Sequence, residues 1–373
     1  MHTSVLKDLR NKTTALLAPR RFEQCRLMAL AAAALITAGV ATAQAQTANW
    51  QRGAFVYTAD ERGNSISAID LAAGRVTSVP IPISPHNLQI AADGKRLLAV
   101  GDPVADGHGH SNVDKAHSAN EAKGRLLVLD TSKLDVKTAA NIAVGVHPAH
   151  VVADQSSRRA FVTNAGDNTV SVVDLAARKL IATVRVGRYP HGLRMSPDGG
   201  EVYVANVQDG TVSVIDVGKL TETGRIPVGN TPVQVGFTPD GSRVYVSLRD
   251  ENRVAVIDTA AKRLIGTIDV GRNPIQVYAT PDGRMVYVAN QGSDETPADT
   301  VSVIDVASGK VIDTIRTAMG AHGVVASDDG GWVFVTNIVA GTVSAIETAT
   351  RKVAAEFSVG RGPNGITYQS PQR

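Results

Sequence analysis

Cysteine is almost absent from this chain of 373 residues, because Cys25 is the one thiol that the sequence contains. A lone thiol near the N-terminus excludes disulfides, and it leaves the rest of the chain without a thiolate nucleophile or a thiolate metal site. Convincing helical periodicity is also absent, which argues against an α-helical fold. The one glycine-rich phosphate-type pattern, "GRGPNG" at 360–365, contains a proline and is not followed by a helix. We therefore reject it as a dinucleotide site.

Long hydrophobic runs are limited to one, "LMALAAAALITAGV" at 27–40. Arginines precede it and the small-residue tripeptides "ATA" and "AQA" follow, an order typical of a secretory signal peptide. The run is shorter than the roughly 20 residues that span a bilayer. We predict a signal peptide at 1–45, cleaved after Ala43 or Ala45, and hence a periplasmic or secreted protein without a membrane span. A retained anchor is the alternative, and Arg20 and Arg21 leave the Sec and twin-arginine routes open.

A net positive charge is absent once this leader is set aside. Residues 1–45 hold six Lys or Arg against two acids, a net charge of +4, whereas the whole chain carries +3. The remainder is therefore about −1, which removes the electrostatic argument for nucleic-acid binding.

A repeat of 42 residues organises the remainder. Pro148, Pro190, Pro232 and Pro274 follow one another at steps of 42, and related phrases surround Pro85 and Pro363. Each unit contains β-branched stretches such as "EVYVAN" and "TVSVIDV", separated by "PDG" turns. We predict four antiparallel strands a unit, with the acids that end the third strands serving as turn residues.

Seven such units predict an all-β fold, a seven-bladed β-propeller over 46–373 made of four-stranded antiparallel blades. Residues 54–83 supply three strands with no inner strand before them, and 363–370 supply an inner strand with nothing after it. The two ends therefore are expected to pair and close the ring as one composite blade. An open solenoid would leave both partial blades with unpaired edges.

The repeat wording "FVTN", "VYVAN", "VFVTN" and "TVSVID" resembles the YVTN-type, YncE-like propeller family over about residues 54–370. The resemblance implies the fold. It says little about function, because such relatives include exported proteins of unassigned role, surface-layer proteins and propeller domains that work beside haem or quinone enzymes.

Departures from the repeat gather on one predicted face, where the loops before the inner strands and after the second strands emerge. The residues after the repeat proline include histidine, asparagine or glutamine in every blade, and three arginines lie in the same loops. Neighbouring residues on a strand point to opposite sides, and His150 is one position further from the repeat proline than His86, His191 and His322. The pattern therefore leaves open whether His150 converges with these three imidazoles. The candidate ligand-binding residues are His86, His150, His191, His322, Asn364, Gln234, Gln276, Arg188, Arg272 and Arg361.

An insertion at 101–124 reaches the same face and contains His108, His110 and His117 beside three aspartates. Neutral imidazoles beside carboxylates suit zinc, copper or nickel, so these three histidines are candidate metal ligands. The alternative is a polar loop with adventitious metal affinity, while the ring histidines hydrogen-bond the loops that hold the blades.

Three functions follow from these observations. The first is a monomeric envelope propeller without catalysis that binds a small ligand, a metal or a partner protein on its histidine face. The second is a metal- or cofactor-dependent enzyme, of lactonase or lyase type or linked to a haem or quinone oxidoreductase, with its site at the channel mouth. The third is a purely architectural module. No catalytic residue is assigned.

Overall fold

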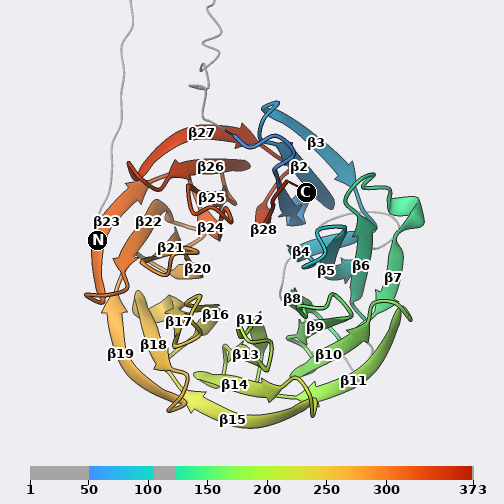
Figure 1. Ribbon diagram of the computed structural model, residues 1–373, viewed down its shortest axis with the longest axis horizontal. Coiled ribbons are helices and arrows are strands. Elements are labelled where there is room, and N and C mark those ends of the chain that lie inside the picture. The colour runs from blue at the N-terminus through green and yellow to red at the C-terminus, as the bar shows by residue number, and fades with distance from the viewer. Residues whose placement is uncertain (1–49, 105–122, 372–373) are drawn as a thin grey trace, which may run out of the picture. The chain divides into compact units, whose positions relative to one another are not determined.

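The computed structural model describes residues 50–104 and 123–371, which form seven four-stranded antiparallel sheets in a ring (Figure 1). Each sheet runs outward from an inner strand at the central channel. Three short 3₁₀ helices interrupt the described loops: η1 (Glu61–Gly63), η2 (Val136–Thr138) and η3 (Arg249–Glu251). The predicted all-β propeller is confirmed. The predicted signal peptide at 1–45 and the histidines at 108, 110 and 117 lie outside the described residues.

The strands occupy equivalent places in every blade. The inner strands are β28 (Pro363–Gln369), β4 (Ile83–Ile90), β8 (Pro148–Ala153), β12 (Pro190–Met195), β16 (Pro232–Phe237), β20 (Pro274–Ala279) and β24 (Ala321–Ala326). The second strands are β1 (Phe55–Asp60), β5 (Arg96–Pro103), β9 (Arg159–Asn164), β13 (Glu201–Asn206), β17 (Arg243–Leu248), β21 (Met285–Gly292) and β25 (Trp332–Asn337). The third strands are β2 (Ser65–Asp70), β6 (Arg125–Asp130), β10 (Thr169–Asp174), β14 (Thr211–Asp216), β18 (Arg253–Asp258), β22 (Pro297–Asp305) and β26 (Thr342–Glu347). The outer strands are β3 (Arg75–Pro80), β7 (Ala140–Ala143), β11 (Lys179–Arg185), β15 (Thr221–Pro227), β19 (Arg263–Asp269), β23 (Lys310–Arg316) and β27 (Lys352–Ser358).

The hydrophobic core lies between neighbouring blades. In β13 five of the six residues are buried, whereas in the outer strand β15 only Ile226 is buried and the other residues are exposed or half-buried. Buried Phe161 of β9, for example, packs in one cluster with Val202 and Val204 of β13 in the next blade. The apolar middle strands therefore fix the order of the blades, because each sheet covers its neighbour's face.

The two ends of the described chain close the ring as predicted. Strand β28 pairs antiparallel with β1, with Phe55 opposite Gln369 and Tyr57 opposite Thr367. The Tyr57 hydroxyl also hydrogen-bonds Gln369 Oε1 at 2.7 Å. All seven residues of β28 are buried, so this strand is an integral part of the first blade.

The repeated asparagine at the end of the second strand ties each of four blades together internally. Asn164 donates from Nδ2 to the hydroxyls of Thr169 and Ser171 on β10, at 3.0 and 2.9 Å. Equivalent bonds start from Asn206, Asn290 and Asn337. This explains the asparagine of the "VAN" and "VTN" phrases, because the buried amide needs partners that the facing third strand supplies.

Turn acids behave as the sequence predicts. Asp216 at the end of β14 accepts backbone N–H bonds from Gly218 and Lys219 at 2.9 and 2.7 Å. Asp198 of the "SPDGG" turn accepts from the Gly200 N–H at 3.0 Å. Both carboxylates are used to stabilise reversals on the face opposite the histidines.

Candidate functional site

Three imidazoles from three successive blades meet at one mouth of the channel. His86 lies on β4, His150 on β8 and His191 on β12. One ring nitrogen from each lies within 4.8 Å of the others. The ring centroids are 5.0 Å apart for His86 and His191, 4.8 Å for His150 and His191, and 5.8 Å for His86 and His150. We call these three residues the histidine cluster.

Bulges at the start of the inner strands explain how His150 joins the cluster. In β8, Pro148 pairs with Asn164 and Val151 with Val162, so two residues of β8 face one residue of β9. The corresponding shift follows Pro85 in β4 and Pro190 in β12. A bulge breaks the simple alternation of side chains. His86 and His191, which directly follow their prolines, therefore reach the same space as His150, which is the second residue after Pro148.

A second layer of groups holds the rings through their Nδ1 atoms. His86 Nδ1 lies 2.9 Å from Glu61 Oε1, and His191 Nδ1 lies 3.2 Å from the Val233 carbonyl oxygen. His150 Nδ1 lies 3.3 Å from Gln234 Nε2. Since the Gln234 carbonyl oxygen already accepts from the Val235 N–H, its amide nitrogen donates to His150. The proton of neutral His150 is therefore on Nε2.

The contact between His86 and His191 decides where a proton sits. Their Nε2 atoms are 3.0 Å apart, although both Nδ1 atoms face oxygen acceptors. Two imidazole lone pairs repel one another at this distance, so one ring must carry a proton between them. Burial disfavours a charge on His86, but Glu61 outweighs it and raises the pKa of His86 above its ordinary value. His86 therefore carries the proton between the two rings, and its Nε2–H donates a hydrogen bond to His191 Nε2.

Burial and mutual repulsion keep the other cluster histidines neutral. Burial, together with the charge on His86, lowers the pKa of His191 to about 3. Burial and the neighbouring His191 and His86 lower the pKa of His150 well below its ordinary value. Burial alone would raise the pKa of Glu61, but His86 and a hydrogen bond from Asn364 lower it to about 2. The cluster thus combines one carboxylate, one basic imidazole and two imidazoles that stay uncharged.

The remaining predicted channel residues form the adjoining part of the ring. Asn364 donates from Nδ2 to Glu61 Oε2 at 2.8 Å, and its backbone oxygen accepts from His322 Nδ1 at 3.2 Å. Burial and the charge on His86 lower the pKa of His322 to about 4, but this ring is not part of the histidine cluster. Gln276 is buried and accepts from the Val324 N–H, so it fastens two blades.

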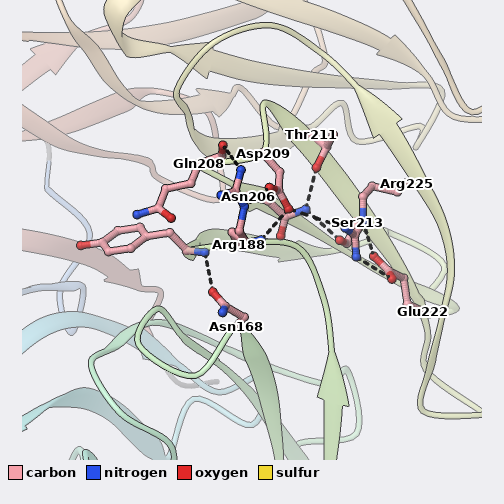
Figure 2. Close-up of polar contacts among 10 residues, drawn as sticks. Asn168, Arg188, Asn206, Gln208, Asp209, Thr211, Ser213, Glu222 and Arg225 are labelled. Atoms are coloured by element: carbon pink, nitrogen blue, oxygen red, sulfur yellow. Dashed lines mark hydrogen bonds and ion pairs between the residues drawn. The ribbon is translucent and has the colours of Figure 1, made fainter. Parts of the chain in front are cut away.

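The three predicted arginines do not reach the cluster. Figure 2 shows Arg188 folded against Asp209, with Nε 2.6 Å from the carboxylate. Arg272 hydrogen-bonds Thr296 in the neighbouring loop, and Arg361 donates to the Arg62 carbonyl oxygen. These side chains hold loops together at the rim, because each has a local acceptor nearer than the channel.

Glu61 is the functional candidate that sequence reasoning missed. It follows β1 directly, in the short helix η1, and so emerges on the same face as the histidines. An acid in a loop of that face was the available signal. His147 lies in the loop before β8, and its Nδ1 lies 2.7 Å from Asp102 Oδ2 at the start of the inserted segment. A pocket of about 320 Å³ runs from Glu61 and His86 past His147 to His191.

The described residues contain no helix with the length and hydropathy of a membrane span. No curated protein matches the chain. Among solved structures, a chain of the Kuenenia stuttgartiensis hydrazine synthase is 21% identical, with a TM-score of 0.64 over 78% of this chain and 90% of that one. A protein of unknown function from Desulfotomaculum acetoxidans is 15% identical, with a TM-score of 0.66 over 85% and 99%.

A candidate 6-phosphogluconolactonase of Bacteroides uniformis is 14% identical, with a TM-score of 0.68 over 85% of this chain and 100% of that one. At such identities these likenesses establish the fold alone. The family model described as "YNCE-like beta-propeller" matches residues 136–371, which is more than half of the sequence. The chain therefore belongs to the YNCE-like β-propeller family.

Proposed function

We propose that this protein binds one divalent transition-metal ion at the channel mouth through His86, His150 and His191. The observation that carries the proposal is the convergence of three imidazoles, whose candidate ligand atoms lie within 4.8 Å of one another. Neutral imidazole is the commonest protein ligand for zinc, copper and nickel. Two of the three rings stay uncharged at neutral pH, as metal ligands must.

Distances support one ion shared by His86 and His191. Two nitrogens bound to zinc at about 2.0–2.1 Å in tetrahedral geometry are about 3.3 Å apart. The Nε2 atoms of His86 and His191 are 3.0 Å apart, close to that value. All three candidate ligand atoms lie within 4.8 Å of one another, so His150 has to move inward to complete such a geometry. The ion takes the place of the proton that bridges the first two rings, so binding releases protons.

The second layer fits a metal site at two of the three rings. Glu61 and the Val233 carbonyl oxygen accept from the Nδ1 atoms of His86 and His191, the usual outer partners of metal-bound imidazoles. At His150 the Gln234 amide donates instead, so it has to turn when Nε2 binds an ion. This mismatch predicts a modest affinity compared with a fully prearranged site.

Zinc titration of the full-length protein, purified without a histidine tag, tests the proposal. We expect one ion per chain by elemental analysis and isothermal titration calorimetry, with loss of binding in His86→Ala, His150→Ala and His191→Ala. His322→Ala is the matched control, because it removes a buried channel imidazole outside the cluster. Copper and nickel are titrated in parallel. Equal zinc binding by the control and the cluster variants, or no stoichiometric binding in the unmodified protein, would reduce the cluster to a structural hydrogen-bond network.

A metal-dependent enzyme is the second candidate, favoured by the pocket of about 320 Å³ beside the cluster. Three protein ligands leave a coordination position open for water or substrate, as in catalytic zinc sites. The pocket would accept a small substrate such as a lactone. Hydrolysis of lactones by the zinc-loaded protein, absent in His191→Ala, would support this candidate.

We also propose that the protein works outside the cytoplasm, on a small ligand or an envelope partner, as a monomer. The proposal rests on the basic, apolar and small-residue order of 20–45 and on the lack of cysteine after Cys25. N-terminal sequencing of the protein from a periplasmic fraction tests it. A mature chain that begins at Gln44 or Gln46 supports export, and an intact leader in the cytoplasmic fraction contradicts it.

A further inference from the structure

A second pocket, of about 270 Å³, lies on three successive inner strands, β12, β16 and β20, and on the turns that follow them. These turns emerge on the face opposite the histidine cluster. Its wall is mainly apolar, with Met195, Phe237 and Ala279 beside three prolines of the turns. Two polar side chains, Arg194 and Tyr278, also line it. We call this space the arginine pocket.

The arginine pocket exists because one blade lacks a side chain at a channel position. One channel position lies four residues after the repeat proline, or after Ala321 in the blade that lacks this proline. In blade order it is occupied by Gln89, Val152, Arg194, Gly236, Tyr278, Val325 and Thr367. Gly236 therefore lies between the blades that carry Arg194 and Tyr278. A Cβ at this glycine would come within 3.0 Å of the Val277 carbonyl oxygen. The gap between the guanidinium and the phenol thus cannot easily be filled by the chain itself.

Arg194 is a cation without a matching anion. Its Nη1 donates to the Leu193 carbonyl oxygen at 3.1 Å, and no carboxylate of the described residues forms an ion pair with it. A guanidinium has five N–H donors, so most of them are left for another acceptor. The Tyr278 hydroxyl likewise has no hydrogen-bond partner among residues 50–104 and 123–371. Burial lowers the pKa of Arg194, which reflects the cost of holding this charge without a counter-ion.

We propose that the arginine pocket binds a small monocarboxylate with an apolar body, such as an arylacetate. Arg194 takes both carboxylate oxygens through parallel N–H bonds, the geometry that a planar guanidinium favours. Tyr278 donates a further hydrogen bond, and the apolar part lies against Met195 and Phe237. The single positive charge matches a monoanion. A volume just below the usual range for ligand pockets of about 300–1,000 Å³ selects small molecules.

Titration of the full-length protein with phenylacetate, acetate, benzyl alcohol and inorganic phosphate tests this assignment, with binding measured by calorimetry. Phenylacetate is expected to bind saturably. Acetate lacks the apolar part and benzyl alcohol lacks the charge, so each should bind at least about 10-fold more weakly. Phosphate that binds more tightly than phenylacetate would overturn the carboxylate assignment, as would failure of phenylacetate to bind at millimolar concentration.

Variants separate a ligand site from a structural arginine. Arg194→Met should weaken phenylacetate binding by at least about 10-fold, and Tyr278→Phe by several-fold. Arg243→Met is the matched control. Arg243 is also half-buried and has no carboxylate partner among the described residues, but it donates to the Val306 carbonyl oxygen and does not line the arginine pocket.

Thermal unfolding without ligand gives the second readout. Because Arg194 lacks a counter-ion, Arg194→Met should melt no earlier than the unmodified protein, while the midpoint rise produced by phenylacetate disappears. An unchanged rise in Arg194→Met would overturn the proposal. This pocket and its tests need no metal, so their outcome is independent of the histidine cluster.

Discussion

Replacing Glu61 with glutamine should destabilise the protein in a pH-dependent way. Glu61 has a pKa lowered from 4.5 to about 2, so it stabilises the fold above about pH 4.5, and this stability is lost as the pH falls toward 2. His86 has a raised pKa, so its contribution is complete below its ordinary value of 6.5 and is lost as the pH rises through the pKa of the folded protein. The loss in Glu61→Gln is therefore largest between about pH 4.5 and 6.5.

The size of this loss follows from the Glu61 carboxylate. The fall in its pKa from 4.5 to about 2 corresponds to about 3 kcal/mol in favour of the charged form. The side chain is 33% exposed, so solvent screening reduces the contribution. We expect the free energy of unfolding to fall by about 1–2 kcal/mol near pH 5.5 and by less at pH 8.

Urea unfolding at a series of pH values from 4 to 8 measures this difference, with an unchanged dependence on urea concentration. Glu251→Gln is the matched control. Glu251 ends the equivalent short helix η3 and accepts from the Asn230 N–H at 2.6 Å, but it has no histidine partner among the described residues. A loss for Glu61→Gln that is flat across the series, or that follows the control, would refute the electrostatic reasoning.

The same variant should weaken zinc binding by about 10- to 100-fold, because it removes the carboxylate that orients His86. Calorimetric titration at pH 7 measures this effect. An unchanged affinity would show that the carboxylate does not support a metal ligand, whatever its effect on stability.

Three further substitutions test other features. Gln234→Glu gives His150 an acceptor at Nδ1, so the zinc affinity should rise by about 10-fold or more. The buried carboxylate should lower the melting midpoint measured without zinc, and an unchanged zinc affinity would contradict the role given to the amide. Asp60→Asn copies the asparagine of four other blades. Because burial raises the pKa of Asp60, its charged form destabilises the fold, so the free energy of unfolding of the variant should be about 1 kcal/mol higher at pH 7 and unchanged below pH 3.8. Urea unfolding at both pH values checks the sign. Gly192→Ala places a Cβ 2.6 Å from the Val233 carbonyl oxygen and should cost about 1–3 kcal/mol, so an unchanged urea midpoint would show that the inner strands can separate.

The fold could be predicted because its determinants are local and repeated. A proline every 42 residues, β-branched strands and "PDG" turns specify one blade, and the incomplete first and last units specify closure. Strand β28 pairs with β1 as expected, since an inner strand without a following unit has one partner that leaves no free edge.

The candidate site could be predicted only in part. His86 and His191 follow the repeat proline directly, so their place near the channel mouth was readable. Whether His150 points the same way depends on a bulge, a backbone irregularity that the alternation rule does not foresee. Glu61 directly follows its second strand, where other blades carry Ala165, Val207 or Arg249, so a comparison between units shows no repeated acid that could single it out. Its importance depends on Asn364, 303 residues away.

The closure of the ring by β28 has a consequence for the order of events during synthesis. Asn364, on that last strand, donates to the carboxylate of Glu61, which in turn holds the ring of His86. A nascent chain that has not yet reached Pro363 contains all three cluster histidines but lacks the anchor of this relay. The ribosome must therefore synthesise the chain as far as β28 before the first blade, and with it the outer support of His86, can assemble.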